Sequence, residues 1–356
     1  MGSRHRGTNE GMRNALARVS PGTPLRDGID RIVRSKAGAL LVLSDDPEVL
    51  SICSGGFLVD APFSPQRLSE LAKMDGAIII SNDGGRIARA NVHLVPDPTV
   101  PTSETGTRHR TAERVARSLE VPVISASEEM GVINVYAGGL KRQIQETGRL
   151  LDRANQALQT LERYKTRLRD AISSLTALEV EDVVTVRDVV IVVQRGEMVT
   201  RIADEIETMI IELGVEARLL RLQLDEIYGE IDDELDLVVA DYLPPHRNVQ
   251  DTVSEMSRLR DDDVLDARMA LSTLHLPDVE LTDGVAPKGL RILRRVNGLS
   301  NDLAARIANH FGELTRLQRA TTADLLAVEG VDESIAGTVK ETLARVTENT
   351  ILDQYS

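Results

Sequence analysis

The stretch Gly106-Thr107-Arg108-His109-Arg110-Thr111-Ala112 is the most informative part of the chain. Within five consecutive residues it carries two guanidiniums, an imidazole and two hydroxyls, and it closely follows the proline-rich segment 96–101. A guanidinium offers a planar fork for phosphate oxygens, and threonine hydroxyls and free backbone N–H groups can fill the remaining acceptor positions. On a turn opened by Gly106, these groups suit a polyanion such as a nucleoside triphosphate. The alternative is a solvated basic loop.

A second motif lies about thirty residues upstream, where Asp75-Gly76-Ala77 leads into Ile78-Ile79-Ile80. The isoleucines are typical of a buried strand, so a carboxylate is expected at the mouth of that strand. Asp83-Gly84-Gly85 then predicts a hairpin turn, to which we assign no chemistry. Further short apolar runs alternate with helix-like sequence at 38–43, 121–124 and 132–136. Residues 1–145 are therefore predicted to form an α/β domain around a mixed sheet.

The two motifs, with Leu94 between them and Ser125-Ala126-Ser127-Glu128-Glu129 after them, resemble the diadenylate cyclase family. The agreement extends to the flanks 91–96 and 112–114, which makes it far more specific than a lone glycine-rich loop. The resemblance implies condensation of two ATP molecules into cyclic di-AMP with release of diphosphate. It also implies that ATP is bound by Gly76, Ala77, Leu94, Thr107, Arg108, His109, Arg110, Thr111 and Ser127.

In such a reaction each 3′-hydroxyl attacks the α-phosphate of the other nucleotide, so catalysis is mostly charge neutralisation and in-line positioning. By the resemblance, the catalytic residues are Asp75, Arg108, His109 and Arg110. The expected cofactor is Mg²⁺ or Mn²⁺, bound by Asp75 together with triphosphate oxygens and assisted by Glu129. Asp75 could also help to deprotonate the 3′-hydroxyl. His109 could donate to a phosphate or hold its own loop in place.

Length and composition limit the remaining possibilities. A chain of 356 residues is expected to form two or three domains, and with no tryptophan and three phenylalanines their cores must be aliphatic. The net charge of −14 opposes nonspecific adhesion to DNA, so any contact with nucleic acid must be local. The single cysteine, Cys53, fits a reducing compartment, and no apolar run approaches the ~20 residues that span a bilayer. We expect a cytoplasmic protein without a membrane partner.

From about residue 141 glycine and proline become rare, and apolar residues recur at spacings of three and four. This pattern is typical of the seam of a long helix. Its members are Leu151, Ala154, Leu158, Leu161, Leu168, Ile172 and Leu175. The helical pattern is interrupted at Pro244-Pro245. Residues 146–285 are therefore predicted to form an all-helical spine, a plausible scaffold for an oligomer.

Residues 286–356 contain two similar stretches, 294–300 around Gly298 and 326–332 around Gly330, each followed by a helix-like run. They resemble tandem helix-hairpin-helix elements, which present backbone amides at a helix start to DNA phosphates without reading sequence. The usual second glycine is replaced by Ser300 and Asp332. The resemblance implies DNA contacts by Lys288, Arg294, Arg295, Gly298 and Gly330, with Arg291 in the same basic flank. The alternative is a pair of αα-hairpins that only pack on each other.

The chain as a whole resembles the bacterial DNA integrity scanning family. The resemblance implies a homo-octamer with cyclase domains face to face, association with the nucleoid, and synthesis that falls when the C-terminal domain engages branched or damaged DNA. The symmetry of the reaction agrees with the facing arrangement, because two facing copies supply nucleophile and electrophile with one set of residues. The alternative, from another class of function, is a DNA-binding scaffold with a degenerate nucleotide pocket.

Overall fold

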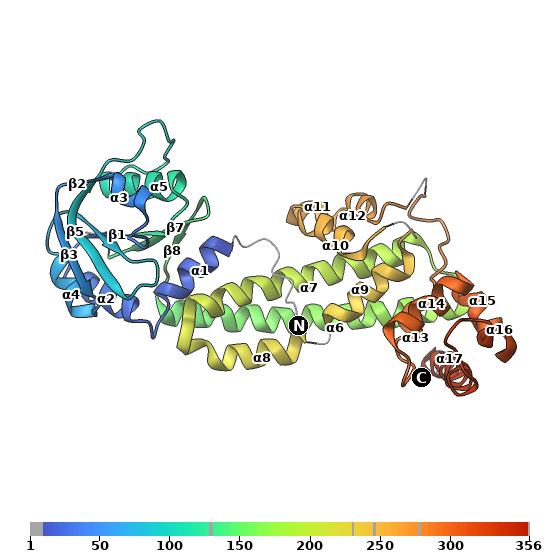
Figure 1. The fold of residues 1–356 in the computed structure, drawn as a ribbon. Helices are drawn as coiled ribbons and strands as arrows, with labels where there is room; N and C mark the ends of the chain where they lie inside the picture. Colours follow the sequence, from blue (N-terminus) through green and yellow to red (C-terminus); the bar gives the residue numbers. More distant parts are fainter. Residues whose placement is uncertain (1–9, 128–130, 230, 245–246, 277–278, 355–356) are drawn as a thin grey trace. The chain divides into compact units, whose positions relative to one another are not determined.

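The computed structural model describes residues 10–127, 131–229, 231–244, 247–276 and 279–354. The chain divides into two compact units, and Figure 1 labels most of the helices and strands. The first unit contains Met1–Ala157 and Asp204–Gln223, and the second contains Leu158–Ala203 and Leu224–Ser356. The return of residues 204–223 to the first unit has no signal in the sequence, and the predicted boundaries at residues 145 and 285 stay a prediction.

The first unit is built on one mixed sheet of eight strands. They are β1 (Ala39–Val42), β2 (Cys53–Ser54), β3 (Phe57–Pro62), β4 (Ala77–Ile80), β5 (Arg86–Leu94), β6 (Val123–Ala126), β7 (Ile133–Ala137) and β8 (Leu140–Gln143). Their order is β2-β5-β4-β1-β6-β7-β8, and β3 also pairs with β5. β1 and β4 run parallel, whereas the neighbouring pairs β4-β5, β1-β6 and β6-β7 are antiparallel. The predicted α/β domain with a mixed sheet is confirmed.

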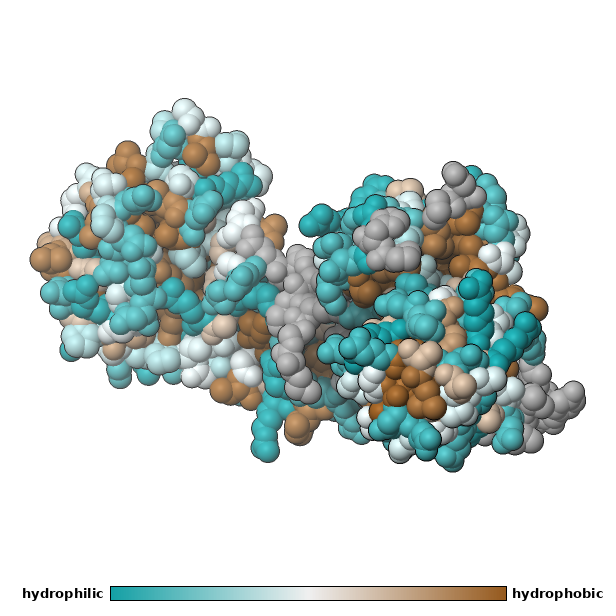
Figure 2. Space-filling model, turned by 45° about the vertical axis from the view of Figure 1, so that its right-hand side comes forward, coloured by the Kyte–Doolittle hydropathy of each residue, from teal (hydrophilic) through white to brown (hydrophobic). Residues whose placement is uncertain are grey.

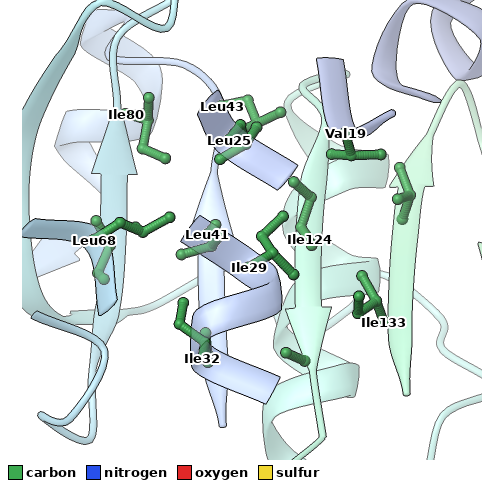
Figure 3. Packing of buried hydrophobic residues seen from close by; sticks show 14 of the residues in the cluster. Val19, Leu25, Ile29, Ile32, Leu41, Leu43, Leu68, Ile80, Ile124 and Ile133 are labelled. Carbon is green, nitrogen blue, oxygen red and sulfur yellow. The ribbon is translucent and has the colours of Figure 1, made fainter. Parts of the chain in front are cut away.

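Aliphatic side chains cover both faces of this sheet, because neighbouring strand residues point to opposite sides. Leu41 and Ile80 face one core cluster, and Leu40 and Ile79 face the other. The first cluster is covered by α1 (Glu10–Val19), α2 (Pro24–Arg34) and α4 (Pro65–Leu71), and the second by α3 (Pro47–Ser51) and α5 (Thr107–Ser118). Figure 3 shows Ile29 of α2 beside Leu41 in the first cluster. The helix α5 therefore lies on the face that carries Leu40 and Ile79.

The long helices follow the sheet in the sequence. They are α6 (Thr147–Glu181) and α7 (Val186–Leu213), followed by η1 (Gly214–Ala217), α8 (Arg218–Tyr228), α9 (Ile231–Tyr242), α10 (Val249–Ser257), α11 (Asp261–Leu265) and α12 (Ala267–Leu274). The predicted seam is largely confirmed, since Ala154, Leu161 and Leu168 are at most 1 % exposed. Leu151 is only partly buried, because its neighbour Leu150 takes the core position.

The C-terminal part of the second unit is a small helical bundle. Its helices are α13 (Leu290–Leu293), α14 (Asn301–Phe311), α15 (Leu314–Arg319), α16 (Thr322–Leu326) and α17 (Glu333–Gln354). They share one apolar cluster that includes Leu293, Ile307 and Val339. The two predicted hairpins are present, one between α13 and α14 and the other between α16 and α17.

None of the helices within the described ranges is both long enough and apolar enough to cross a bilayer. This holds for α6 and α7 despite their length, since both carry charged residues throughout. Figure 2 shows hydrophilic residues interspersed with hydrophobic patches over the face that it presents.

Candidate active site

The turn predicted at Gly106 is the start of helix α5. Gly106 is the N-cap residue, and with no side chain it leaves the first turn without a side-chain cap. The first intrahelical bond, from the Arg110 N–H to the Gly106 carbonyl, is 2.8 Å long. The N–H groups of residues 107–109 precede that bond, and such groups at a helix start bind anions. The sequence predicted which side chains gather here. It predicted a turn, however, and not the start of a helix that aligns these amides.

A pocket of about 290 Å³ opens beside this helix start. Its apolar wall comes from strands β1, β4 and β5 and consists of Leu40, Ala77, Val92 and Leu94. Its polar wall consists of Asp75, His93, Thr107, Arg108 and Thr111, and Gly76 completes the lining. The structure thus brings together at one pocket most of the residues that the sequence assigned to ATP. His109, Arg110 and Ser127 are outside this lining.

Two opposite charges meet at the pocket. The Arg108 Nη2 donates to Asp75 Oδ1 over 3.1 Å, although the two residues are 33 positions apart in sequence. The Asp75 side chain is 99 % exposed, whereas that of Arg108 is 29 % exposed. Arg108 has room to lie there because Gly38 has no side chain, since a Cβ on Gly38 would come within 2.0 Å of Nη1. An exposed carboxylate that is bound on one oxygen by a cation is still accessible to further ligands.

Gly76 lines the pocket, and the space that a side chain would fill at this position is occupied by a neighbouring strand. In the structure the backbone of Asn91 on β5 takes that space, and a Cβ on Gly76 would be 2.5 Å from the Asn91 Cα. Asn91 has a φ of 54°, at an irregularity in the β4-β5 pairing. Gly76 therefore shapes the pocket by allowing β5 to pass close to it.

Leu94 belongs both to the core and to the pocket lining. It is 4 % exposed and belongs to the apolar cluster beneath α5, and it also lines the pocket. Ala77, at the start of β4, does the same with 2 % exposure. These side chains give the pocket a flat apolar wall next to its charged residues. Such a wall suits the face of an aromatic base.

His109 is partly buried beside the first turn of α5. Burial lowers the pKa of its imidazole, Glu104 opposes that change, and the cations Lys141 and Arg108 add to it. A lowered pKa keeps the ring neutral at pH 7, so that one ring nitrogen can donate and the other accept. His109 is therefore suited to hydrogen bonding rather than to charge pairing.

The other predicted residues occupy separate places. Arg110 is exposed on α5, and the Thr111 hydroxyl donates to the Thr107 carbonyl over 3.0 Å. Ser127 follows β6, and its N–H donates to the Val132 carbonyl over 2.9 Å. Glu129 lies outside the described residues, so its predicted metal role has no structural description.

Charged residues of α5 hold the segment that precedes the helix, and this arrangement had little signal in the sequence. Glu113 is 6 % exposed on α5 and accepts hydrogen bonds from the Ser103 N–H at 3.0 Å and the Thr102 hydroxyl at 2.5 Å. Arg114 and Arg117 donate to carbonyls of the same loop, at 3.0 and 2.9 Å. In the sequence, residues 112–114 stand out only through the family resemblance. Its charged residues fix the segment that leads into Gly106.

The hairpins of the second unit have glycines where left-handed backbone is needed. Gly298 has a φ of 81° and Gly330 a φ of 90°. The residues that replace the expected second glycine are helix caps. The Ser300 hydroxyl accepts from the Leu303 N–H at 3.3 Å, and Asp332 Oδ1 accepts from the Ile335 N–H at 2.8 Å. The first hairpin thus ends in a neutral cap and the second in an anionic one.

The basic flank of the first hairpin is only partly available to a ligand. Arg291 is 2 % exposed and forms a buried ion pair with Glu179 of α6, so its place in the flank is corrected. The Lys288 ammonium donates to the carbonyls of Ala240 and Leu243, at 3.0 and 2.7 Å. Arg294 and Arg295 are nearer the surface, and Arg295 pairs with Glu234 over 3.2 Å. These last two arginines are the better candidates for contact with phosphates.

Two family models match the chain. The model described as "DisA bacterial checkpoint controller nucleotide-binding" matches residues 26–141, and the one described as "DisA bacterial checkpoint controller linker region" matches residues 144–281. The first match covers the sheet and the pocket beside α5. The fold and the site thus define a nucleotide-binding domain of the checkpoint controller type, followed by its helical linker.

Curated relatives match over nearly the full length. The DNA integrity scanning protein DisA of Acidothermus cellulolyticus is 48% identical, with 98% of this chain and 97% of that protein covered. The protein of the same name from Frankia alni is 49% identical over 96% and 97%, and that from Streptomyces coelicolor is 46% identical over 97% and 94%. The chain belongs to the DisA family of DNA integrity scanning proteins.

Solved structures match a smaller part. DacA from Staphylococcus aureus, as a double mutant, is 24% identical and covers 38% of this chain and 87% of its own, with a TM-score of 0.27. A hypothetical membrane spanning protein from Bacillus cereus is 23% identical and covers 35% and 62%, with a TM-score of 0.31.

Proposed function

We propose that this protein is a diadenylate cyclase, which converts two ATP into cyclic di-AMP and two diphosphates, and that DNA engaged by its C-terminal hairpins lowers the rate. The observation that supports this most is the meeting of three groups at one pocket: the uncapped start of α5, the Arg108 guanidinium and the exposed Asp75 carboxylate. Family membership favours the same assignment.

The two walls of the pocket suit two different parts of ATP. Adenine stacks on the apolar wall that includes Ala77 and Leu94. The triphosphate lies at the start of α5, where free N–H groups, Arg108 and Thr107 neutralise its charge. This arrangement aligns donors before the reaction begins, so little reorganisation accompanies bond formation. The neutral His109 supplies a further hydrogen bond to a phosphate or to the segment that leads into the helix.

Asp75 fits a divalent cation. Mg²⁺ usually binds through one or two carboxylates and completes its shell with water and substrate phosphates, and Asp75 offers one exposed carboxylate at the pocket. Mg²⁺ or Mn²⁺ bound there would neutralise charge on the triphosphate. Asp75 would hold such an ion in place of its present partner Arg108, whose guanidinium would then be available to the phosphates. Glu129 remains a second proposed ligand.

The reaction needs two copies of the domain. A single pocket holds one ATP, and its 3′-hydroxyl requires the α-phosphate of another. Facing copies provide this with identical residues on both sides. Arg110 is exposed on α5 outside the pocket lining, so it is available to the nucleotide of the facing copy. We propose a homo-octamer, and light scattering of the purified protein tests that number.

DNA contact is proposed for the first hairpin, where Gly298 precedes a helix with a neutral cap and Arg294 and Arg295 flank it. Branched or damaged DNA is the expected form, bound through phosphates without reading of bases. Removal of the whole C-terminal region is a poor test, because it would also remove the groups that pair with Glu179 and Asp241 in the remaining chain. Synthesis with and without a four-way DNA junction, with linear duplex as control, tests the regulation directly.

The deciding experiment is incubation of the purified chain with ATP and Mg²⁺ or Mn²⁺, followed by chromatography of the products. We expect cyclic di-AMP from the parent and at least about 10³-fold less from Asp75→Asn. Glu70→Gln is the matched control, since Glu70 is an exposed carboxylate paired with Lys73 on the same unit. Absence of product with either metal from a folded oligomer would favour the DNA-binding scaffold with a degenerate pocket.

A further inference from the structure

A second pocket, of about 350 Å³, lies in the same unit at the other end of the parallel strands. The nucleotide pocket meets β1 and β4 at their amino ends, through Leu40 and Ala77. The second pocket includes Ile80, the last residue of β4, and the hairpin turn that follows it. Crevices outside the carboxyl ends of parallel strands are the usual ligand sites of open α/β sheets. Nothing in the proposed cyclase reaction uses this place.

A half-buried guanidinium forms one side of the second pocket. Arg18, near the end of α1, donates through Nη1 to the Leu43 carbonyl over 3.1 Å and through Nη2 to the Ser81 carbonyl over 3.4 Å. These carbonyls directly follow β1 and β4, so Arg18 is fixed across the ends of both strands. Burial lowers the pKa of Arg18 and Asp83 opposes that change, yet a guanidinium stays charged. Two bonds leave most of its five donors for a ligand.

A carboxylate forms the other side. Asp83 Oδ1 accepts from the Ser81 hydroxyl at 2.6 Å and from the Gly85 N–H at 2.9 Å, which fixes its orientation. These bonds and Arg86 hold the pKa of Asp83 below its ordinary value. Asp83 attracts Arg18 electrostatically, but the ion pairs among the described residues do not include these two. The pocket therefore presents separated opposite charges.

The remaining walls are apolar or bare backbone. Leu25 and Ile80 are 9 % and 1 % exposed, and Phe63 packs against the same core cluster. Gly84, with a φ of 75°, brings backbone without a side chain to within reach of Arg18, since a Cβ there would be 3.7 Å from Nη2. The site thus combines one cation, one anion and an aliphatic wall.

We infer that this pocket binds a free α-amino acid with an aliphatic side chain. Its carboxylate pairs with Arg18, its ammonium pairs with Asp83, and its side chain rests on Leu25 and Ile80. Each ligand charge meets a fixed opposite charge, and charge-assisted bonds of this kind are the strong ones. A ligand with only one of the charges offers no opposite charge to the other protein group.

The first test uses the intact protein and three small molecules of one shape. Equilibrium dialysis measures retention of radiolabelled L-leucine and its displacement by unlabelled L-leucine, L-leucinamide, which lacks the carboxylate, or 4-methylpentanoate, which lacks the ammonium. We expect both analogues to compete at least about tenfold less well than L-leucine. Equal competition by all three, or no retention of L-leucine at millimolar concentration, would overturn the inference.

The second test uses variants. Asp83→Asn keeps the oxygen that accepts from Ser81 and Gly85 but removes the charge, and Arg18→Met keeps much of the aliphatic stem. Each is expected to weaken L-leucine binding by at least about tenfold, whereas Glu70→Gln on α4 leaves it unchanged. Because Arg18 also joins two strands, its variant is compared only after its urea unfolding midpoint has been measured. Unchanged binding by Asp83→Asn contradicts the inference by itself, whatever the outcome for Arg18→Met.

Discussion

The helix starts of the two units differ in what meets their free N–H groups. In the first unit α5 begins at Gly106 without a side-chain cap, beside Arg108 and Thr107. In the second unit α17 begins after Asp332, whose carboxylate accepts from the Ile335 N–H. The comparison shows that a carboxylate of the protein at a helix start occupies the N–H groups that would otherwise be open to a phosphate.

The same unit offers two intermediate cases. α14 is capped by Ser300, which is neutral. α13 has no cap of its own, but Asp241 of α9 accepts from the N–H groups of Leu290 and Arg291, at 2.6 and 3.0 Å. Of these four helix starts, those of α13 and α17 already face a carboxylate, so only α5 and α14 suit a ligand anion.

The largest effect is expected from closing the α5 start. Gly106→Asp is compatible with the backbone, whose φ of −79° and ψ of 142° suit any residue. Its carboxylate would cap the first turn and repel the triphosphate, so cyclic di-AMP synthesis should fall by about 10³-fold. Gly106→Asn supplies a cap without a charge, so its rate of cyclic di-AMP synthesis should fall much less. Equal losses of activity in the two variants would show that the added charge is not the cause.

The second prediction concerns the carboxylate at α13. The pKa of Asp241 is raised to about 6, chiefly by burial and with a smaller contribution from Glu179, while the N–H groups of Arg291 and Leu290 oppose the rise. The folded state therefore binds the Asp241 proton more tightly than the unfolded chain, and this stabilisation is complete below about pH 4 and is lost as the pH rises through 6. The loss is on the order of 3 kcal/mol.

Urea unfolding of the full chain between pH 4 and 7 measures this loss. Asp241→Asn has no proton to bind, so the advantage of the parent over the variant should shrink across that range. A difference between the two proteins that does not change with pH would show that Asp241 ionises as it does in the unfolded chain.

The third prediction exchanges the caps of the hairpins. Ser300→Asp puts an anion where the first hairpin is proposed to meet a phosphate, and binding of a four-way junction should weaken by about tenfold. Ser300→Thr keeps a neutral cap and is the control. Fluorescence anisotropy at fixed salt gives both affinities. An unchanged affinity for Ser300→Asp would favour hairpins that only pack on each other.

The smallest effect is expected from the cap of α17. Asp332→Ala removes the bond to the Ile335 N–H and should lower the free energy of unfolding by about 1 kcal/mol. Asp332→Asn keeps an acceptor and should retain most of that stability. Chemical denaturation compares the three proteins, and DNA affinity should change little, since the second hairpin is already closed by its own carboxylate.

The sequence predicted the elements whose signals are local. The isoleucines after Gly76 form β4, the runs near 121 and 132 form β6 and β7, and the glycines of both hairpins have positive φ. Leu40, Val92 and His93 line the pocket without such a signal, whereas Thr107, Arg108 and Thr111 were recognisable, because phosphate binding needs particular side chains that stand close together in the sequence. The space that Gly38 leaves for Arg108 was not, since it depends on how β1 and α5 pack.

The basic flank of the first hairpin shows most clearly what the sequence could not predict. Lys288, Arg291, Arg294 and Arg295 look alike in sequence, yet Arg291 is buried against Glu179, which lies 112 residues earlier. Lys288 donates to carbonyls more than forty residues away. Composition identifies a charge but not the distant group that satisfies it.

The sequence alone therefore determined the mixed sheet, the long helices and the inventory of groups able to bind a nucleotide. Periodicity and turn residues act between near neighbours, and that range is sufficient for secondary structure. Tertiary structure decided which charges face solvent or a ligand and which face one another, as with Asp75 and Asp241. The physical reason is desolvation, because the free energy of a charge depends on the atoms that surround it in space.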